Sequence, residues 1–240
     1  MKITSKMLYQ ELRSVLAPLM KLSGFKTTKG GMLGWKRPTT GGYLSLWFQC
    51  DKWGWNERWG SQFVLQFSIA SEPSDAMTPT GRFERIGFLL EGFEELDELR
   101  IKNNSVIEHL PGTINHQLVT GILHDGSEYI AEGYKVDNQK AIYGRDIWLN
   151  YYSIEDVRDW AHYFEKNLLN YVSLFENEIR SEQGKARVRF DQMMSNVQRT
   201  KDVKDKMHIF EGYIESETDE EFSTDAVKWL KVLREIVSIG

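Results

Sequence analysis

Residues 51–60 (DKWGWNERWG) contain the side chains of this sequence that are best suited to recognition. Trp53, Trp55 and Trp59 fall close together, and Arg58 stands among them. Indole rings beside cationic side chains stack on bases, on sugars or on the side chains of a protein partner. These four residues are therefore predicted to form a binding surface. The alternative interpretation is that the rings fold back over a sheet and cap the hydrophobic core, and the sequence leaves both open.

The N-terminal segment is basic. At 100° per residue, Lys2, Lys6 and Arg13 fall within about 40° of one another on one helical face. Clustered cations neutralise phosphates, so this stripe indicates an alternative function in which the chain binds nucleic acid. The chain as a whole has a net charge of −5 and contains no nucleic-acid-recognition motif. We therefore expect any binding to single-stranded nucleic acid to be weak and to be lost at moderate salt.

No motif of a catalytic, metal or cofactor site is present. The carboxylates between residues 91 and 98 have the spacing of a solvated helical face, and the five histidines contain no HExxH pattern. Cys50 is expected to be a core thiol rather than a nucleophile. We therefore predict no metal and no cofactor. A binding or protein-interaction protein is favoured, and an enzyme whose residues assemble only in the fold remains the other alternative.

Composition and patterning also bear on the cellular compartment. The first 20 residues lack the continuous apolar stretch of a signal peptide, and no run of about 18 apolar residues exists. A single cysteine is typical of proteins in reducing compartments. A cytoplasmic protein without membrane association is the expectation.

Strand patterns dominate the first two thirds of the chain. Alternating apolar residues predict strands over 32–37, 43–50 and 62–70, which form an antiparallel meander with one buried face. A second hairpin is predicted around Asp125-Gly126, with strands over 117–123 and 128–136, followed by a strand over 141–152. The predicted fold class is α+β, with a mostly antiparallel sheet, helices packed on one face and a helical C-terminal extension.

Helix signals frame these strands. Thr4 or Ser5 caps a first helix, and Ser153 with Asp156 begins a long one that continues to about residue 179. The segment 83–99 is ambiguous because glycines interrupt its helical pattern. We predict an α+β domain over 1–180 and a helical extension over 181–240 with a break near Thr200. An acidic loop follows over 215–221, and Ser223 or Thr224 caps a final helix.

The final helix is apolar over about 220° of its circumference, which is more than one packing face requires. One side is expected to pack on the helix over residues 157–179. The other side is expected to contact a protein partner or a second protomer, so that the chain forms a homodimer through this helix. The alternative is that both sides are buried within the chain.

Residues 8–90 contain five short motifs that carry a resemblance: LAPLMKLSGFK at 16–26, FQ at 48–49, GW at 54–55, GSQF at 60–63 and RIG at 85–87. In this order of helix, GFK-type turn, strand, FQ strand, polar loop and Phe-initiated strand, the chain resembles an uncharacterised bacterial domain-of-unknown-function family. The resemblance implies an α+β fold and a bacterial source. That family supplies no catalytic residues to transfer to this sequence.

Overall fold

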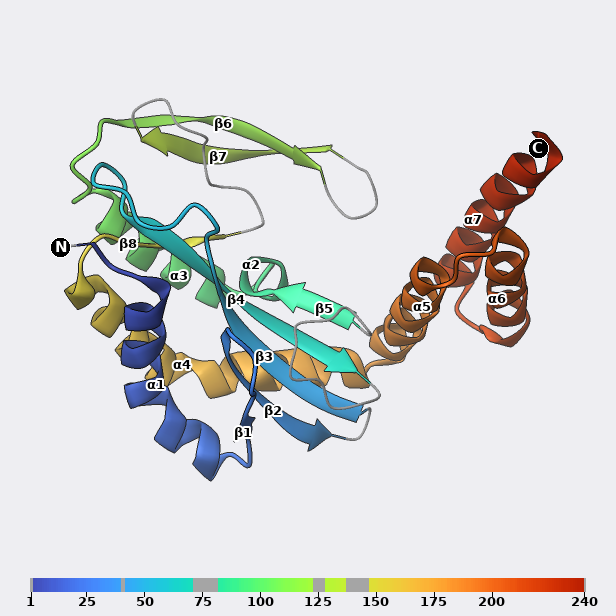
Figure 1. Ribbon diagram of the computed structural model, residues 1–240, viewed down its shortest axis with the longest axis horizontal. Helices are drawn as coiled ribbons and strands as arrows, with labels where there is room; N and C mark the ends of the chain where they lie inside the picture. Colours follow the sequence, from blue (N-terminus) through green and yellow to red (C-terminus); the bar gives the residue numbers. More distant parts are fainter. Residues whose placement is uncertain (1, 40–41, 71–81, 123–127, 137–146, 240) are drawn as a thin grey trace. The chain divides into compact units, whose positions relative to one another are not determined.

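The structure is a computed structural model that describes residues 2–39, 42–70, 82–122, 128–136 and 147–239 (Figure 1). Its helices are α1 (Ser5–Leu22), α2 (Ile86–Leu89), α3 (Glu94–Ile107), α4 (Ile154–Arg180), α5 (Glu182–Arg199), α6 (Val203–Ser216) and α7 (Glu220–Ile239). Its strands are β1 (Lys26–Thr27), β2 (Leu33–Thr39), β3 (Gly42–Cys50), β4 (Ser61–Ala70), β5 (Arg82–Arg85), β6 (Ile114–Ile122), β7 (Glu128–Val136) and β8 (Leu149–Tyr151). This content confirms the predicted α+β class.

Within the described residues, the main sheet contains six strands. Their order is β1-β2-β3-β4-β5, and β8 pairs with β4 in antiparallel register. Strands β6 and β7 form a separate antiparallel hairpin, as the Asp-Gly pair predicts. The predicted turn at 124–127 and the residues 141–146 of the predicted last strand lie outside the described residues.

The chain divides into two compact units: unit 1 is Met1–Arg37, Ser45–Phe67 and Glu84–Val172, and unit 2 is Pro38–Leu44, Ser68–Phe83 and Ser173–Gly240.

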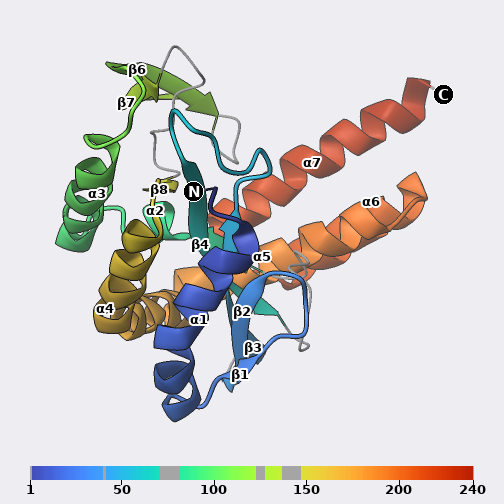
Figure 2. The same ribbon diagram turned by 60° about the vertical axis from the view of Figure 1, so that its left-hand side comes forward.

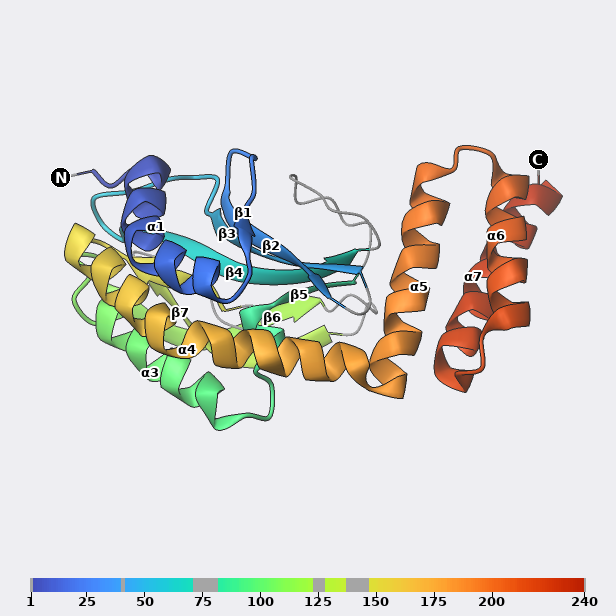
Figure 3. The ribbon, with the colours of Figure 1, turned by 90° about the horizontal axis from the view of Figure 1, so that it is seen from below.

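The core of unit 1 is aromatic and lies between the sheet and helices α1 and α4. Helix α4 runs along the sheet (Figure 3), and its Phe164 ring makes an edge contact with Phe48 of β3 at 5.3 Å between centroids. Trp160 contacts Phe63 of β4 in the same way at 6.1 Å. Helix α1 contributes the side chains of Leu8, Leu12, Leu16 and Met20, all fully buried. Burial of this apolar surface is the main source of the unit's stability.

Local capping explains where α1 and α4 begin. Thr4 is the N-cap of α1, and its hydroxyl accepts a hydrogen bond from the Met7 N–H at 3.3 Å. At the start of α4, the Asp156 carboxylate accepts from the Ser153 N–H at 2.7 Å, while the Ser153 hydroxyl accepts from the Asp156 N–H at 3.1 Å. These reciprocal bonds form the capping box that the sequence predicts.

Strand β4 is buried on both faces, so the predicted meander with a single buried face is wrong at this position. Gln62 and Gln66 lie on the face opposite the aromatic core and are only 4% and 0% exposed. Gln66 is hydrogen-bonded to Gln49 of the neighbouring strand, and the Gln62 amide donates to Asn150 at 2.8 Å. Alternation separates apolar from polar residues, but it does not reveal that a polar face is also covered.

Asn150 of β8 is the centre of a buried hydrogen-bond network. Asn103 of α3 accepts from the Asn150 N–H at 2.7 Å and from its amide at 3.1 Å. The Trp160 indole N–H donates to the Asn150 carbonyl at 2.8 Å. With Gln62, these bonds join β4, β8, α3 and α4, and they satisfy polar groups that would be costly to bury unpaired.

Unit 2 contains α5, α6 and α7, which pack together around one apolar cluster (Figure 2). The buried members of this cluster are Ala186, Met193, Val197, Phe210, Tyr213, Phe222, Ala226 and Leu230. The predicted break near Thr200 is present, since Thr200 ends α5 and Asp202 caps α6. Within unit 2, helix α7 thus packs on α5 and α6.

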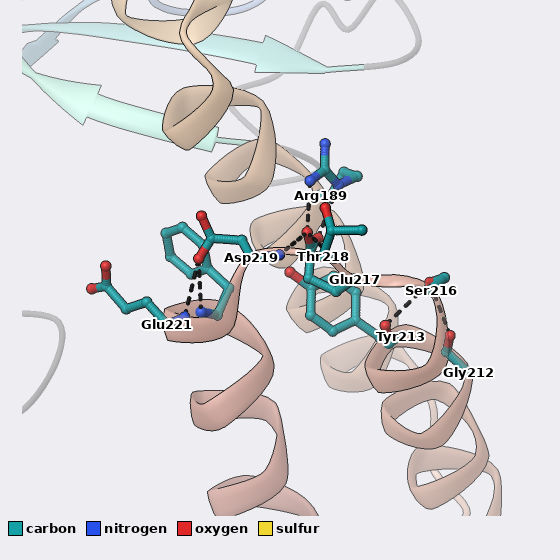
Figure 4. A network of polar contacts seen from close by, with 9 residues as sticks. Arg189, Gly212, Tyr213, Ser216, Glu217, Thr218, Asp219 and Glu221 are labelled. Carbon is teal, nitrogen blue, oxygen red and sulfur yellow. Dashed lines mark hydrogen bonds and ion pairs between the residues drawn. The ribbon is translucent and has the colours of Figure 1, made fainter.

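The turn between α6 and α7 is fixed by a buried carboxylate (Figure 4). The Glu217 side chain is 1% exposed and accepts two hydrogen bonds from the Arg189 guanidinium, at 2.9 and 2.7 Å. It also accepts from the N–H groups of Thr218 and Asp219 at 2.9 and 3.0 Å. The Arg189 bonds lower the pKa of Glu217 to about 2, against the opposing effect of burial.

Three predicted boundaries differ from the structure. Helix α7 begins at Glu220, because Asp219 accepts from the N–H groups of Glu221 and Phe222 and replaces Ser223 or Thr224 as the cap. The acidic loop over 215–221 is correspondingly shorter. The ambiguous segment contains strand β5 and helix α2, and Gly92 with a φ of 85° separates them from α3.

Candidate functional site

The connection between β3 and β4 holds its own conformation through main-chain and side-chain hydrogen bonds. Asn56 and Gly60 exchange both main-chain bonds, at 2.7 and 2.8 Å. The Asp51 carboxylate accepts from the Trp53 N–H at 3.1 Å, and the Asn56 side chain accepts from the Arg58 N–H at 2.8 Å. Asp and Asn side chains bonded two residues ahead stabilise tight turns. Residues 51–60 are hereafter called the Trp loop.

Two distant segments of unit 1 anchor the Trp loop. The Trp55 indole N–H donates to the Tyr152 carbonyl at 2.9 Å, and the two rings lie 5.5 Å apart. In return, the Tyr152 hydroxyl donates to the Glu57 carbonyl at 3.2 Å. From the segment after α3, the Gly112 N–H donates to the Arg58 carbonyl at 2.9 Å. The loop is therefore ordered before any ligand binds, which reduces the entropy cost of recognition.

Gly60 ends the Trp loop at a position that no other residue type fits. Its φ is 67°, in the left-handed region. A Cβ atom at this position would lie 2.1 Å from the Tyr151 carbonyl oxygen. The close approach of the loop to β8 thus depends on the absence of a side chain.

The three tryptophans have different environments. Trp59 is partly buried and packs on the small cluster of Ile107 and Leu110, and Trp55 is partly buried against Tyr152. Trp53 is 80% exposed, and the Lys52 ammonium lies 4.8 Å from its ring centroid. Two indoles thus support the loop and the third is presented to solvent, a distinction that the residue types alone do not reveal.

The exposed side chains around Trp53 carry charges of both signs. Lys52, Glu57 and Arg58 are exposed, and Asp51 is partly exposed. The loop's two acids and two bases cancel, so the surface combines one large aromatic ring with balanced charge. Of the four predicted binding residues, the structure therefore presents Trp53 and Arg58, while Trp55 and Trp59 hold them in place.

The three predicted phosphate-binding cations are exposed, but they do not share one helix. Lys6 and Arg13 lie on α1, whereas Lys2 precedes the Thr4 cap, so the helical angle relates only the first two. The segment before α1 and the Trp loop lie at the same end of unit 1 (Figures 1 and 3). Tyr9 of α1 interacts electrostatically with Cys50, at the end of the strand that enters the loop.

Cys50 and the His, Asp and Glu side chains are the groups that nucleophilic chemistry or metal binding would use. Burial raises the pKa of the Cys50 thiol to about 11, so this thiol is protonated at neutral pH. In the part of the chain that the structure describes, no three His, Cys, Asp or Glu side chains gather as metal ligands. Among the same residues, no helix has the length and apolar character needed to cross a membrane.

Sequence reasoning found the Trp loop but missed the residues that position it. Tyr152 is 97 residues away from Trp55 in the chain, and Gly112 follows a helix whose extent was not predicted. No nearby residue in the sequence signals either contact, because a hydrogen bond to a distant main-chain carbonyl depends on the fold. Comparison with known proteins found no matching family model, no matching curated protein and no matching solved structure.

Proposed function

We propose that this chain is a binding protein that contacts a protein partner through the Trp loop, with Trp53 as the anchor and Arg58 beside it. The observation that carries the proposal is an 80% exposed indole on a loop whose main chain is already fixed. Tryptophan and arginine are the residue types that most often dominate the energy of protein interfaces. Exposing such a ring in water has no benefit for the chain's own stability.

The balanced charge of the Trp loop supports a protein partner over a nucleic acid. A phosphate-binding surface needs an excess of cations around its stacking ring. Here Asp51 and Glu57 offset Lys52 and Arg58. Charges of both signs around an aromatic anchor instead suit the polar rim of a protein interface.

The test compares Trp53→Ala with a matched control, Leu22→Ala. Leu22 is 88% exposed and lies at the end of α1, so its truncation removes exposed apolar surface outside the loop. Full-length chains are immobilised, and the proteins recovered from the native host are quantified by mass spectrometry. We expect at least one partner that the wild type and Leu22→Ala recover equally and Trp53→Ala loses. Binding of that purified partner should weaken about 30-fold in Trp53→Ala, which corresponds to about 2 kcal/mol.

A partner set that is identical for all three chains would overturn the proposal. The proposal would also be overturned if the purified partner bound Trp53→Ala as tightly as the wild type.

Single-stranded nucleic acid is the second candidate, because the segment before α1 lies at the end of unit 1 that carries the Trp loop (Figures 1 and 3). Lys2 belongs to this segment, and Lys6 belongs to the first turn of α1. A labelled oligonucleotide titrated at two salt concentrations separates the two candidates. We expect weak binding that disappears at moderate salt, since only a few phosphate contacts are available. Tight binding that survives high salt and is lost in Trp53→Ala would assign the loop to nucleic acid.

A further inference from the structure

Helix α7 exposes an apolar stripe that borders the side chains packed on the α5–α6 cluster. Trp229, Val232 and Ile236 are 50%, 46% and 54% exposed. At 100° per residue they lie within about 60° of one another. Val227 is 49% exposed but lies at least about 140° from all three, so it belongs to another side of the helix. The three neighbouring residues are hereafter called the α7 stripe.

One edge of the α7 stripe carries two opposite charges. Lys228 and Glu235 are both exposed and are seven residues apart, so they lie within about 20° of each other around the helix. Lys228 forms an ion pair with Asp225 at 2.8 Å, with both side chains accessible to solvent. Along the helix axis, Lys228 lies one residue before Trp229 and Glu235 lies one residue before Ile236, so the midpoint between the two charges falls between Lys231 and Val232.

We propose that the α7 stripe is a self-association surface on which a second copy of this chain docks in antiparallel orientation. The two-fold axis passes between Lys231 and Val232, so that Lys228 of each copy faces Glu235 of the partner subunit. This surface is separate from the Trp loop, and the inference does not depend on the proposed function.

The apolar side chains fit this register. With a rise of about 1.5 Å per residue, Trp229, Val232 and Ile236 of one helix lie at about −4, +1 and +7 Å from the two-fold axis, measured along the helix. The two-fold places the corresponding side chains of the other helix at about +4, −1 and −7 Å. The side chains therefore alternate along the interface instead of colliding, which is the requirement for knobs-into-holes packing.

Charge selects the antiparallel orientation. In a parallel pair, Lys228 and Glu235 of opposite subunits stay seven residues apart, about 10 Å along the axis. In the antiparallel pair they meet twice, because residues on the same edge of two antiparallel helices face each other. Opposed helix dipoles also favour this orientation. Three half-exposed side chains bury less surface than the roughly 800 Å² per partner of a standard interface. We therefore expect a weak dimer with a dissociation constant in the micromolar range.

Sedimentation velocity on the full chain over a concentration series at low salt measures this association. We expect Trp229→Ala to weaken dimerisation at least about tenfold. Val227→Ala is the matched control, since it truncates an equally exposed apolar residue outside the stripe, and it should leave the dissociation constant unchanged. Circular dichroism checks that each variant retains its helix content.

Charge reversal tests the register itself. Lys228→Glu alone and Glu235→Lys alone each create two like-charge contacts and should weaken self-association about tenfold. An equimolar mixture of the two single variants restores both opposite-charge contacts between subunits and should dimerise like the wild type. The double variant K228E/E235K should do the same by itself.

Two results would overturn the proposal. The first is a wild type that is monomeric at about 200 µM, well above the expected micromolar range. The second is a dimer that Trp229→Ala does not weaken, or in which mixing the two charge variants restores nothing. Either would show that a second copy does not occupy the α7 stripe in this register.

Discussion

The Trp loop and helix α7 both expose large apolar side chains, but different forces hold them. The loop depends on single hydrogen bonds to remote carbonyls, such as the 2.9 Å bond from Trp55 to Tyr152. Helix α7 depends on its own periodicity and on the apolar cluster that its Phe222, Ala226 and Leu230 share with α5 and α6. An exposed residue in the loop is therefore positioned by a few specific contacts, and one on α7 by a distributed packing face.

This difference predicts how the two regions respond to substitution. In the loop, the loss of one anchoring position should displace the whole exposed surface. On α7, exposed side chains should be replaceable with little effect on the helix. Only the turn that precedes the helix depends on one group, the Glu217 carboxylate.

The largest effect is expected for Gly60→Ala. The substitution places an L-residue at a φ of 67° and drives its Cβ into the Tyr151 carbonyl, so we expect a loss of about 3 kcal/mol of unfolding free energy. Gly54→Ala is the control, because Gly54 has a φ of 69° but open space around it, and it should cost only about 1 kcal/mol. Urea unfolding of both variants measures the difference, and equal losses would show that the approach to β8 does not constrain the loop.

A smaller, pH-dependent effect is expected for Glu217→Gln. Because the folded pKa of Glu217 is about 2, below the ordinary value of 4.5, its ionised form stabilises the fold above pH 4.5, and this contribution is lost as the pH falls towards 2. We expect the variant to lose about 2 kcal/mol at pH 7, since Arg189 is half exposed, and to show less acid destabilisation than the wild type.

Hydrogen exchange of the α6–α7 segment, followed from pH 7 to pH 3, localises this effect. The control is Glu211→Gln, which removes the exposed ion pair with Arg234 at 2.9 Å and should change stability by less than about 0.5 kcal/mol. If Glu211→Gln and Glu217→Gln were equivalent, the buried carboxylate would have no special role in the turn.

Local signals predicted much of the fold, whereas contacts between distant segments could not be predicted. The Thr4 cap, the Ser153–Asp156 box and the break near Thr200 each follow from a few adjacent residues. The cap of α7 was misplaced because three residue types suited to capping, Asp219, Ser223 and Thr224, follow one another closely, and the Glu217 network favours the first.

The same distinction applies to the candidate site. The density of tryptophan identified the Trp loop, but only the fold distinguishes Trp53 from Trp55. That distinction rests on Tyr152, which reaches the loop through the pairing of β8 with β4. Composition indicates which residue types are able to bind, and long-range main-chain contacts decide which of them remain exposed.

The most direct test of the account is the unfolding free energy of Trp53→Ala, measured in urea beside Trp55→Ala. Trp55 is partly buried and its indole satisfies the Tyr152 carbonyl, so its truncation should cost about 2 kcal/mol. Trp53 is 80% exposed, and its truncation should change stability by less than about 0.5 kcal/mol. A loss for Trp53→Ala as large as that for Trp55→Ala would contradict the claim that the chain presents Trp53 for binding rather than for its own stability.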